Sequence, residues 1–268
     1  TRVQMRSKSK IVVIVSSLLV LCFAEDELKR LRSGFAAHGN DEKINYILMD
    51  YELKDVTING QTFKKPTIPF GGLNAEEGEP VLPTVTTFYQ VAPNKSYNIK
   101  VNIQSSEIFE NIDIVPHQTW DPLTGETTVP FKRNIDLYTS DEPFPKKQAS
   151  ISQIIVFRDL PVVKVSFTPF RYRPLSRQLE IITSADISLV ETGNIEPVQT
   201  PGRRSRVFEP LYESIVVNYN RSVSDEDYQK PSILYILPSN SSNLMSNLDI
   251  LFEWRHKSGY VVNYASTS

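Results

Sequence analysis

Hydrophobic and polar positions alternate along much of the middle of the chain. In residues 97–103, 161–168 and 179–189, apolar side chains occupy nearly every second position, with polar side chains between them. Such alternation is typical of antiparallel strands with one face on a core and the other in water. Turn clusters separate these strands, among them PFGGLNAEEGEP, TWDPLTGE and SDEPFPKK. The pattern predicts a mainly β chain, an antiparallel β-sandwich that begins at about residue 47.

The segments that flank the predicted sandwich have a different pattern. Residues 25–46 are charged and weakly helical, and Leu28, Leu31 and Phe35 would share one helix face. This predicts a short docking helix or a mobile leader. Residues 192–206 are polar, contain Pro and Gly, and end in a basic cluster, which predicts an exposed linker or long loop.

The last part of the chain, residues 231–268, changes in kind. Ile233–Leu237 is a continuous apolar run, as expected of a strand buried on both faces. Gly259 would end the helix that follows, and Tyr260–Tyr264 would form a second strand. The helix itself is predicted from a single apolar stripe formed by Leu244, Leu248, Leu251 and Phe252. This order predicts a βαβ unit with parallel pairing, the truncated start of an α/β domain.

The first 24 residues have the pattern of a targeting segment. A basic stretch, MRSKSK, precedes the apolar run IVVIVSSLLVLCFA, which ends at Ala24. This predicts a secretory signal peptide cleaved near Ala24, with an uncleaved anchor or a lipoprotein as alternatives. Cys22 is the single cysteine and lies inside this segment, so the exported chain would contain no disulfide. The predicted location is secreted or at the cell surface.

The charge balance and the placement of reactive residues argue against several classes of function. With 29 Lys and Arg against 31 Asp and Glu, no charge-driven binding to nucleic acid or membrane is expected. The three histidines, His38, His117 and His256, are far apart, and His256 is predicted to be a solvated residue in a last helical turn. The acidic run Asp225–Asp227 lacks the spacing of a calcium loop. We therefore expect no catalytic residue, cofactor or metal site in this chain.

Two short segments stand out from the strand pattern. In Gly78–Pro83 (GEPVLP), two prolines three residues apart remove backbone donors and favour extended backbone before each of them. Such a segment can join a sheet only at an edge. Val207–Tyr219 (VFEPLYESIVVNY) leads from the basic cluster to an acidic stretch. Each segment taken alone indicates an ordinary structural connection.

Taken together, these segments resemble the prodomain of gingipain-type cysteine peptidases. GEPVLP resembles the entry of that prodomain, and Phe157–Glu191 resembles its central strands. VFEPLYESIVVNY resembles its closing segment. The tail with FEWRHKSGY resembles the first strand, helix and second strand of the caspase-like catalytic domain that follows. The resemblance extends over most of residues 70–264.

The resemblance implies a zymogen. Residues 25–230 would form a β-sandwich prodomain that covers the active-site cleft of its own catalytic domain and assists its folding. A processing protease would then remove the prodomain. The family's catalytic His and Cys lie downstream of the first βαβ unit, so this chain is expected to have no peptidase activity. Its partners would be its own catalytic domain and the processing protease, with no nucleic acid and no membrane after signal cleavage.

Two sites follow from the resemblance. In arginine-specific relatives a basic residue of a prodomain loop fills the specificity pocket, but the corresponding loop here, residues 117–130, contains no Arg or Lys. Trp120 or Leu123 would be the plug for a different pocket, or the loop is an ordinary surface loop. Processing in the family falls shortly after the closing Asn-Tyr, which makes Arg221 the nearest candidate. The exposed basic cluster of Arg203, Arg204 and Arg206 is the second.

Two other functions compete with the zymogen hypothesis. A non-enzymatic secreted β-sandwich, such as an adhesion or binding module, would share the strand pattern, but it would not lead into a buried parallel strand. A stand-alone protease inhibitor acting in trans would require the chain to end at Ser268.

Overall fold

The computed structural model describes residues 34–37, 43–119, 130–200, 202–219, 221, 224, 228–239 and 244–266. The predicted signal peptide with Cys22 and Ala24, the acidic run Asp225–Asp227, and the loop residues Trp120 and Leu123 lie outside these ranges. So does His38.

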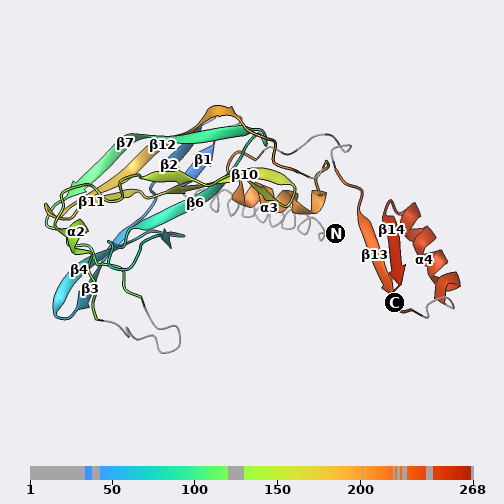
Figure 1. The fold of residues 1–268 in the computed structure, drawn as a ribbon, viewed down its shortest axis with the longest axis horizontal. Coiled ribbons are helices and arrows are strands. Elements are labelled where there is room, and N and C mark those ends of the chain that lie inside the picture. Colours follow the sequence, from blue (N-terminus) through green and yellow to red (C-terminus); the bar gives the residue numbers. More distant parts are fainter. Residues whose placement is uncertain are drawn as a thin grey trace, which may run out of the picture.

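Two antiparallel sheets pack face to face and form the body of the molecule (Figure 1). One sheet has the order β1-β2-β12-β11, with β7 paired along the other edge of β12. Its strands are β1 (Phe35–Ala37), β2 (Lys43–Ile47), β7 (Lys95–Phe109), β11 (Phe170–Arg173) and β12 (Gln178–Asn194). The second sheet has the order β5-β6-β10-β8, with β9 also paired with β10. Its strands are β5 (Gly72–Leu73), β6 (Pro83–Gln90), β8 (Ala149–Ile151), β9 (Ile155–Phe157) and β10 (Leu160–Phe167). The predicted β-sandwich is confirmed.

The predicted alternation coincides with the long strands of the sandwich. Residues 97–103 lie in β7, 161–167 in β10 and 179–189 in β12. Their apolar faces meet in one cluster between the sheets, where the rings of Tyr46 and Phe167 stand edge to face with centroids 4.8 Å apart. The core between the sheets therefore comes directly from the period-two pattern.

The sandwich begins earlier in the chain than the sequence predicted. The sequence predicts a short docking helix or a mobile leader around Phe35, but Phe35 lies in β1, which pairs with β2 in antiparallel register. Its ring is buried in the core and contacts Tyr46 edge to face at 5.4 Å. The error arose because three apolar residues at helical spacing were weighed without the strand partner, which follows only a few residues later.

A second cluster fills one end of the sandwich. It joins Phe170 and Tyr172 of β11 to Leu179 and Ile181 of β12 and to the short helix α2 (Ile135–Tyr138). The hairpin of β3 (Glu52–Ile58) and β4 (Gln61–Thr67) projects from this end (Figure 1). Phe63 of β4 packs against Val81 and Val115, which connects the hairpin to the GEPVLP segment.

The GEPVLP segment forms no long ladder, as its prolines require. Pro80 makes an isolated antiparallel bridge to Pro116, and the Val81 amide donates to the Val115 carbonyl at 2.9 Å. Pro83 is the first residue of β6. Most of the segment is buried, so it acts as a wedge between the hairpin and the sandwich.

The C-terminal residues form a separate βαβ unit beside the sandwich (Figure 1). Strand β13 (Ser232–Leu237) pairs in parallel with β14 (Val261–Ser266), and helix α4 (Met245–Lys257) connects them. This confirms the predicted order and the parallel pairing. Within the described residues, no helix is both long and apolar enough to cross a membrane.

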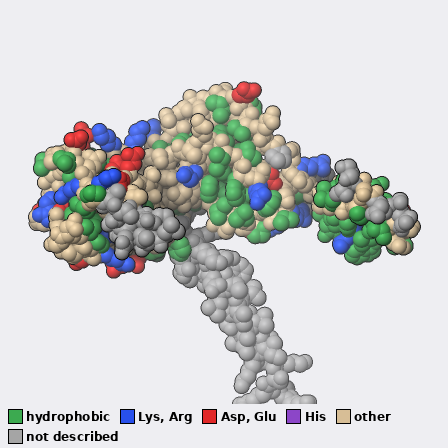
Figure 2. Space-filling view, turned by 60° about the horizontal axis from the view of Figure 1, so that its bottom comes forward, with side chains coloured by type: hydrophobic (Ala, Val, Ile, Leu, Met, Phe, Trp, Pro, Cys, Tyr) green, Lys and Arg blue, Asp and Glu red, His purple; other side chains and the backbone are tan. Residues whose placement is uncertain are grey.

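Within the part of the chain that the structure describes, strand β13 of the tail is covered on one face only. Phe252 of α4 packs on Tyr235 and Tyr264 of the two strands, with centroids 4.9 and 5.7 Å apart. On the other face, Leu234 is 61% exposed and Ile236 70% exposed. Hydrophobic side chains consequently gather on this lobe (Figure 2). The strand is apolar on both faces, but only α4 covers it among the described residues.

Buried tyrosines make the sandwich sensitive to alkali. Tyr138 and Tyr172 donate their hydroxyl protons to the carbonyls of Ile114 and Ile112, at 2.9 and 3.2 Å. Burial is the main cause that raises the pKa of Tyr172 to about 12, and burial also raises the pKa of Tyr46 and Tyr138. The folded protein therefore keeps these protons at a pH where the unfolded chain, with a tyrosine pKa of about 10, loses them.

We expect stability to be unaffected by these tyrosines below pH 10 and to fall as the pH rises from 10 to 12. The free energy of unfolding should fall by about 1.4 kcal/mol per pH unit for each tyrosine that stays protonated only in the fold. Urea unfolding between pH 9 and 12 measures this slope. In Tyr172→Phe the free energy of unfolding should fall less steeply with pH, by the contribution of one tyrosine. An unchanged slope in that variant would contradict the role of Tyr172 in the alkaline loss of stability.

Candidate functional site

Two buried carboxylates organise the segment that follows the sandwich. Asp159, in the turn between β9 and β10, is 7% exposed and accepts a hydrogen bond from the Tyr212 hydroxyl. Its second oxygen accepts from the Ser205 amide at 2.5 Å. Tyr212 belongs to α3 (Glu209–Ile215), which packs on Leu160 and Val162 of β10. Asp159 thus attaches both the basic cluster and α3 to the sandwich.

Glu209 is the second carboxylate and begins α3 with 1% exposure. Its Oε2 atom accepts from the Tyr219 hydroxyl at 2.6 Å and lies 3.9 Å from Nε of Arg221. Burial, followed by the hydrogen bond to Glu209, raises the pKa of Tyr219. The carboxylate at a helix N-terminus is also favourably placed in the helix dipole. Glu209 therefore connects α3 to the residues just before and at the predicted processing site.

The chain downstream of Arg221 returns to the basic cluster. Tyr228 forms a parallel bridge with Arg204, and the Gln229 amide donates to the Arg204 carbonyl at 2.7 Å. The side-chain amide of Gln229 donates to the Arg203 carbonyl at 2.6 Å. The guanidinium of Arg206 lies 4.6 Å from the ring centroid of Tyr228, a cation–π contact. We call this set the junction network: Asp159, Arg204, Ser205, Arg206, Glu209, Tyr212, Tyr219, Arg221, Tyr228 and Gln229.

The junction network brings together Arg204, Arg206 and Arg221, three of the four arginines that the sequence singles out as processing candidates. Arg206 and Arg221 are exposed, whereas Arg204 is half-buried with its guanidinium 5.9 Å from the Tyr219 ring centroid. Sequence reasoning missed Asp159 and Glu209. The only sequence signal for a buried carboxylate would have been an acidic residue inside an otherwise apolar pattern. Glu209, which precedes Pro210, is equally typical of an exposed residue in the first turn of a helix.

Hydrogen bonds hold the chain on both sides of Arg221. Upstream, the Val217 amide donates to the Phe88 carbonyl at 2.9 Å, and the side chain of Asn218 pairs with the backbone of Gln90 at 2.7 and 3.0 Å. Downstream, Gln229 is held by Arg203 and Arg204. The arginine therefore lies in a short span between two attachment points, outside regular secondary structure.

The loop proposed to block a cleft has a well-defined base, although Trp120 and Leu123 themselves lie outside the described residues. Gln118 is 5% exposed, and its side chain donates to the Lys132 carbonyl at 2.7 Å and accepts from the Lys132 amide at 2.9 Å. His117 exchanges backbone hydrogen bonds with Gly78 and Glu79, both at 2.7 Å. His117 thus serves the loop base through its backbone.

Gly78 completes this base and explains why GEPVLP begins with glycine. The φ angle of Gly78 is +87°, which favours glycine. Its carbonyl accepts from the Asn134 amide at 3.0 Å, and a Cβ built there would lie 3.0 Å from the same nitrogen. Gly78 therefore holds both ends of the loop, His117 on one side and Asn134 on the other.

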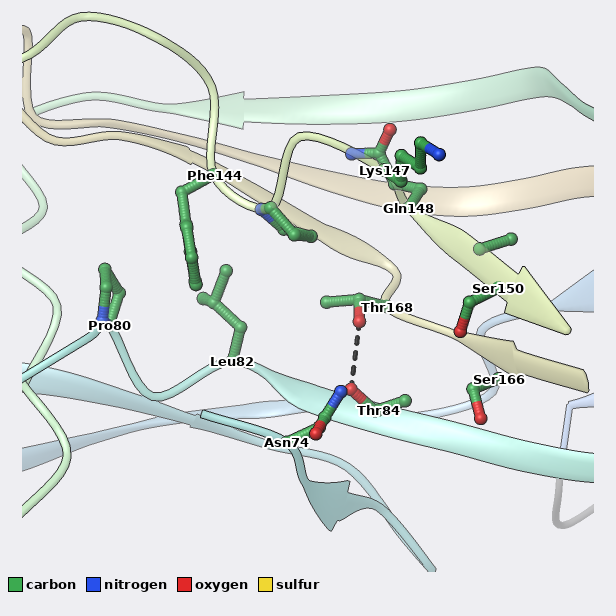
Figure 3. A pocket seen from close by; sticks show the side chains of 12 residues that line it. Asn74, Pro80, Leu82, Thr84, Phe144, Lys147, Gln148, Ser150, Ser166 and Thr168 are labelled. Atoms are coloured by element: carbon green, nitrogen blue, oxygen red, sulfur yellow. Dashed lines mark hydrogen bonds between the residues drawn. The ribbon is translucent and has the colours of Figure 1, made fainter. Parts of the chain in front are cut away.

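The cavities of the described part of the chain include one small pocket and one open depression. A pocket of about 70 Å³ lies between β6 and the segment before β8, where the hydroxyls of Thr84 and Thr168 share a hydrogen bond of 2.9 Å (Figure 3). It is far smaller than the pockets of about 300 to 1,000 Å³ that hold small molecules. A depression of about 660 Å³, open to solvent, is lined in part by Arg204 of the junction network and by Asn218. Among the described residues, no three His, Cys, Asp or Glu side chains are grouped to bind a metal.

Comparison with known proteins gives the class and then the family. The family model Propeptide_C25 matches residues 28–225, which include the sandwich and end inside the junction. The class of protein is therefore a propeptide domain. The chain belongs to the Propeptide_C25 family, and the predicted resemblance is confirmed.

Similar proteins include gingipains and a solved structure. Gingipain R2 of Porphyromonas gingivalis strain W83 is 22% identical over 84% of this chain and 31% of the relative. Gingipain R1 of the same species is 22% identical over 81% of this chain and 22% of the relative. The chain thus spans less than a third of the length of these relatives. A complex of the P. gingivalis RgpB pro- and mature domains matches with a TM-score of 0.60 at 21% identity, over 70% of this chain and all of the matched chain. That likeness supports the sandwich fold.

Proposed function

We propose that this chain is the propeptide region of a secreted gingipain-like cysteine endopeptidase precursor, with the start of its caspase-like domain. The propeptide keeps the peptidase inactive by covering its active-site cleft and assists its folding. The observation that carries this proposal is the change of architecture at the junction: the family match ends at residue 225, and a parallel βαβ unit begins at Ser232. The solved relative, a complex of pro- and mature domains, supports the same arrangement.

The proposed domains are a signal peptide over residues 1–24, the propeptide over 25–230 and the peptidase start over 231–268. Cleavage after Ala24 would release the chain outside the cell. The parallel pairing of β13 and β14 favours this division over an adhesion module, since such a module would continue as antiparallel sandwich strands.

Processing is proposed at Arg221. Its side chain is exposed and its backbone lies between two attached segments, whereas the Arg204 carbonyl is hydrogen-bonded to Gln229. Proteolysis requires a chain that can leave its hydrogen bonds, so Arg221 is the more accessible site. The cluster of Arg204 and Arg206 would become available after Gln229 has detached.

The test uses the peptidase encoded by the same reading frame beyond residue 268, produced separately. The purified chain should inhibit it at about 1 µM or below, in the range of ordinary protein interfaces. Papain serves as the control peptidase and should keep its full activity. A reading frame without a downstream α/β domain carrying a His and a Cys would overturn the proposal. So would undiminished peptidase activity at micromolar concentrations of the chain.

A further inference from the structure

Phe70 occupies a backbone position where bulky residues are rarely found. The segment Ile68–Gly71 is a tight turn closed by the Gly71 amide donating to the Ile68 carbonyl at 3.1 Å. Pro69 sits at the second position and Phe70 at the third, with φ of +57°. A turn with Pro followed by positive φ strongly prefers Gly or Asn at that third position. A phenylalanine there is strained.

The turn is firmly attached to the core, so the strain does not reflect a loose segment. A Cβ built on Gly71 would lie 2.6 Å from Cγ1 of Ile68 and 3.2 Å from Cβ of Pro83. Ile68 packs against both main hydrophobic clusters. Directly after the turn, Gly72 and Leu73 pair with β6. The position of the Phe70 backbone is therefore fixed from both sides.

The other non-glycine residues with positive φ are either of a type that tolerates it or have side chains engaged within the fold. Asn59 and Asn111 are of the residue type that tolerates this conformation. Arg158 lies over the Phe208 ring at 4.9 Å, and Arg177 donates to the Asn111 carbonyl at 3.3 Å. Phe70 is different. Its side chain is 72% exposed, and it takes part in no ring contact or side-chain hydrogen bond in the described part of the protein.

A strained backbone that presents an aromatic ring to water is unfavourable in the isolated chain. Such outliers persist where the surrounding structure enforces them, and they concentrate at sites that bind something. A ring on a rigid turn loses little conformational freedom on binding, which makes it a good interface anchor. Leu73, three residues on in β5, is also 48% exposed.

We propose that Phe70 is an anchor that inserts into an apolar pocket on the peptidase domain of the same precursor. This inference rests on the proposed function. The choice of the peptidase domain as partner follows from where Phe70 lies in the chain. The segment that carries Phe70 continues to Gly78, which holds the base of the 117–130 loop through His117 and Asn134. Anchor and loop base therefore belong to one continuous stretch and would face one partner. The peptidase domain is the partner that remains covalently attached to this stretch.

Three substitutions of Phe70 distinguish the contribution of its ring to binding from the effect of its backbone strain on stability. Phe70→Ala removes the ring and keeps a side chain at positive φ, so it should raise the inhibition constant against the downstream peptidase about tenfold or more, as expected of a hot-spot residue. Phe70→Asn also removes the ring but suits the turn, so it should weaken inhibition equally while raising the Tm by about 2 to 4 °C. Phe70→Tyr keeps the ring and should inhibit like the unmodified chain.

Leu175→Ala is the matched control, because Leu175 is also an exposed apolar turn residue, at 61% exposure. It should leave inhibition unchanged. If the unmodified chain inhibits and Phe70→Ala inhibits equally well, the anchor is wrong while the proposed function stands. If the unmodified chain does not inhibit, the proposed function itself fails. Self-association of the unmodified chain that Phe70→Ala abolishes, measured by sedimentation, would assign the anchor to a second copy instead and overturn the proposal.

Discussion

Arg221→Ala should slow cleavage of the junction in the complete precursor by at least about 100-fold, because a pocket built to pair a charged side chain rejects one that lacks it. The product that begins at residue 222 should disappear from N-terminal sequencing or mass spectrometry. The variant should fold normally. The guanidinium is exposed and lies 3.9 Å from the buried Glu209, too far for a hydrogen bond, and Glu209 keeps the hydrogen bond from the Tyr219 hydroxyl.

Arg203→Ala is the matched control for this variant. Arg203 is exposed and belongs to the basic cluster, and its backbone carbonyl, not its side chain, accepts the hydrogen bond from Gln229. Its substitution should leave cleavage at residue 221 unchanged. Unaltered cleavage of the same bond in Arg221→Ala would refute Arg221 as the recognised residue. Cleavage that moves to Arg204 or Arg206 in both variants would assign processing to the basic cluster.

Tyr212→Ala should be among the most destabilising single substitutions in the chain. Tyr212 is fully buried, and its ring packs near those of Phe157, Phe208 and Tyr219, with centroids 6.2, 6.3 and 5.3 Å away. Truncation of a buried aromatic side chain costs about 3 to 5 kcal/mol in the free energy of unfolding. The substitution also removes the hydroxyl that donates to the buried Asp159. Urea unfolding measures the loss.

Tyr212→Phe separates packing from hydrogen bonding. It keeps the ring and removes only the hydroxyl, so it should cost about 1 to 3 kcal/mol, the range for a buried acceptor that loses its partner. In Tyr212→Ala, α3 should detach from the sandwich, and limited trypsin digestion should cut at Arg204 and Arg206 much faster than in Tyr212→Phe. An unfolding midpoint of Tyr212→Ala equal to that of the unmodified chain would show that α3 does not depend on this residue.

The two substitutions test different properties of one region. Arg221 tests recognition by a protease, whereas Tyr212 tests whether the fold limits access to the other arginines. If both expectations hold, the order of processing is set by the junction network: the span at Arg221 is cut first, and the basic cluster follows once α3 and Gln229 have left their positions.

The strand pattern was enough to predict the sandwich because burial on one face leaves a period of two in the sequence. The strands around 97–103, 161–168 and 179–189 are found as predicted. The apolar pattern also predicted the strand–helix–strand order of the tail and the parallel pairing of its strands. Two apolar runs separated by an amphipathic helix have few other arrangements. Phe35 was assigned wrongly because a strand of three residues is too short to show a period.

The sequence alone thus determined the fold class, the βαβ tail and the family, each of which depends on local patterns of apolar and turn residues. Tertiary structure alone decided the functional geometry. Asp159 and Glu209 are ordinary acidic residues in the sequence, and they become organising groups only because Tyr212, Tyr219 and Ser205 are brought to them from elsewhere in the chain. Likewise, Phe70 in the PFGG turn reads as part of a simple turn cluster. Its positive φ and its exposure are properties of the folded chain, where Ile68 and Pro83 lie close to Gly71 of the same turn, and long-range packing leaves no periodic trace in a sequence.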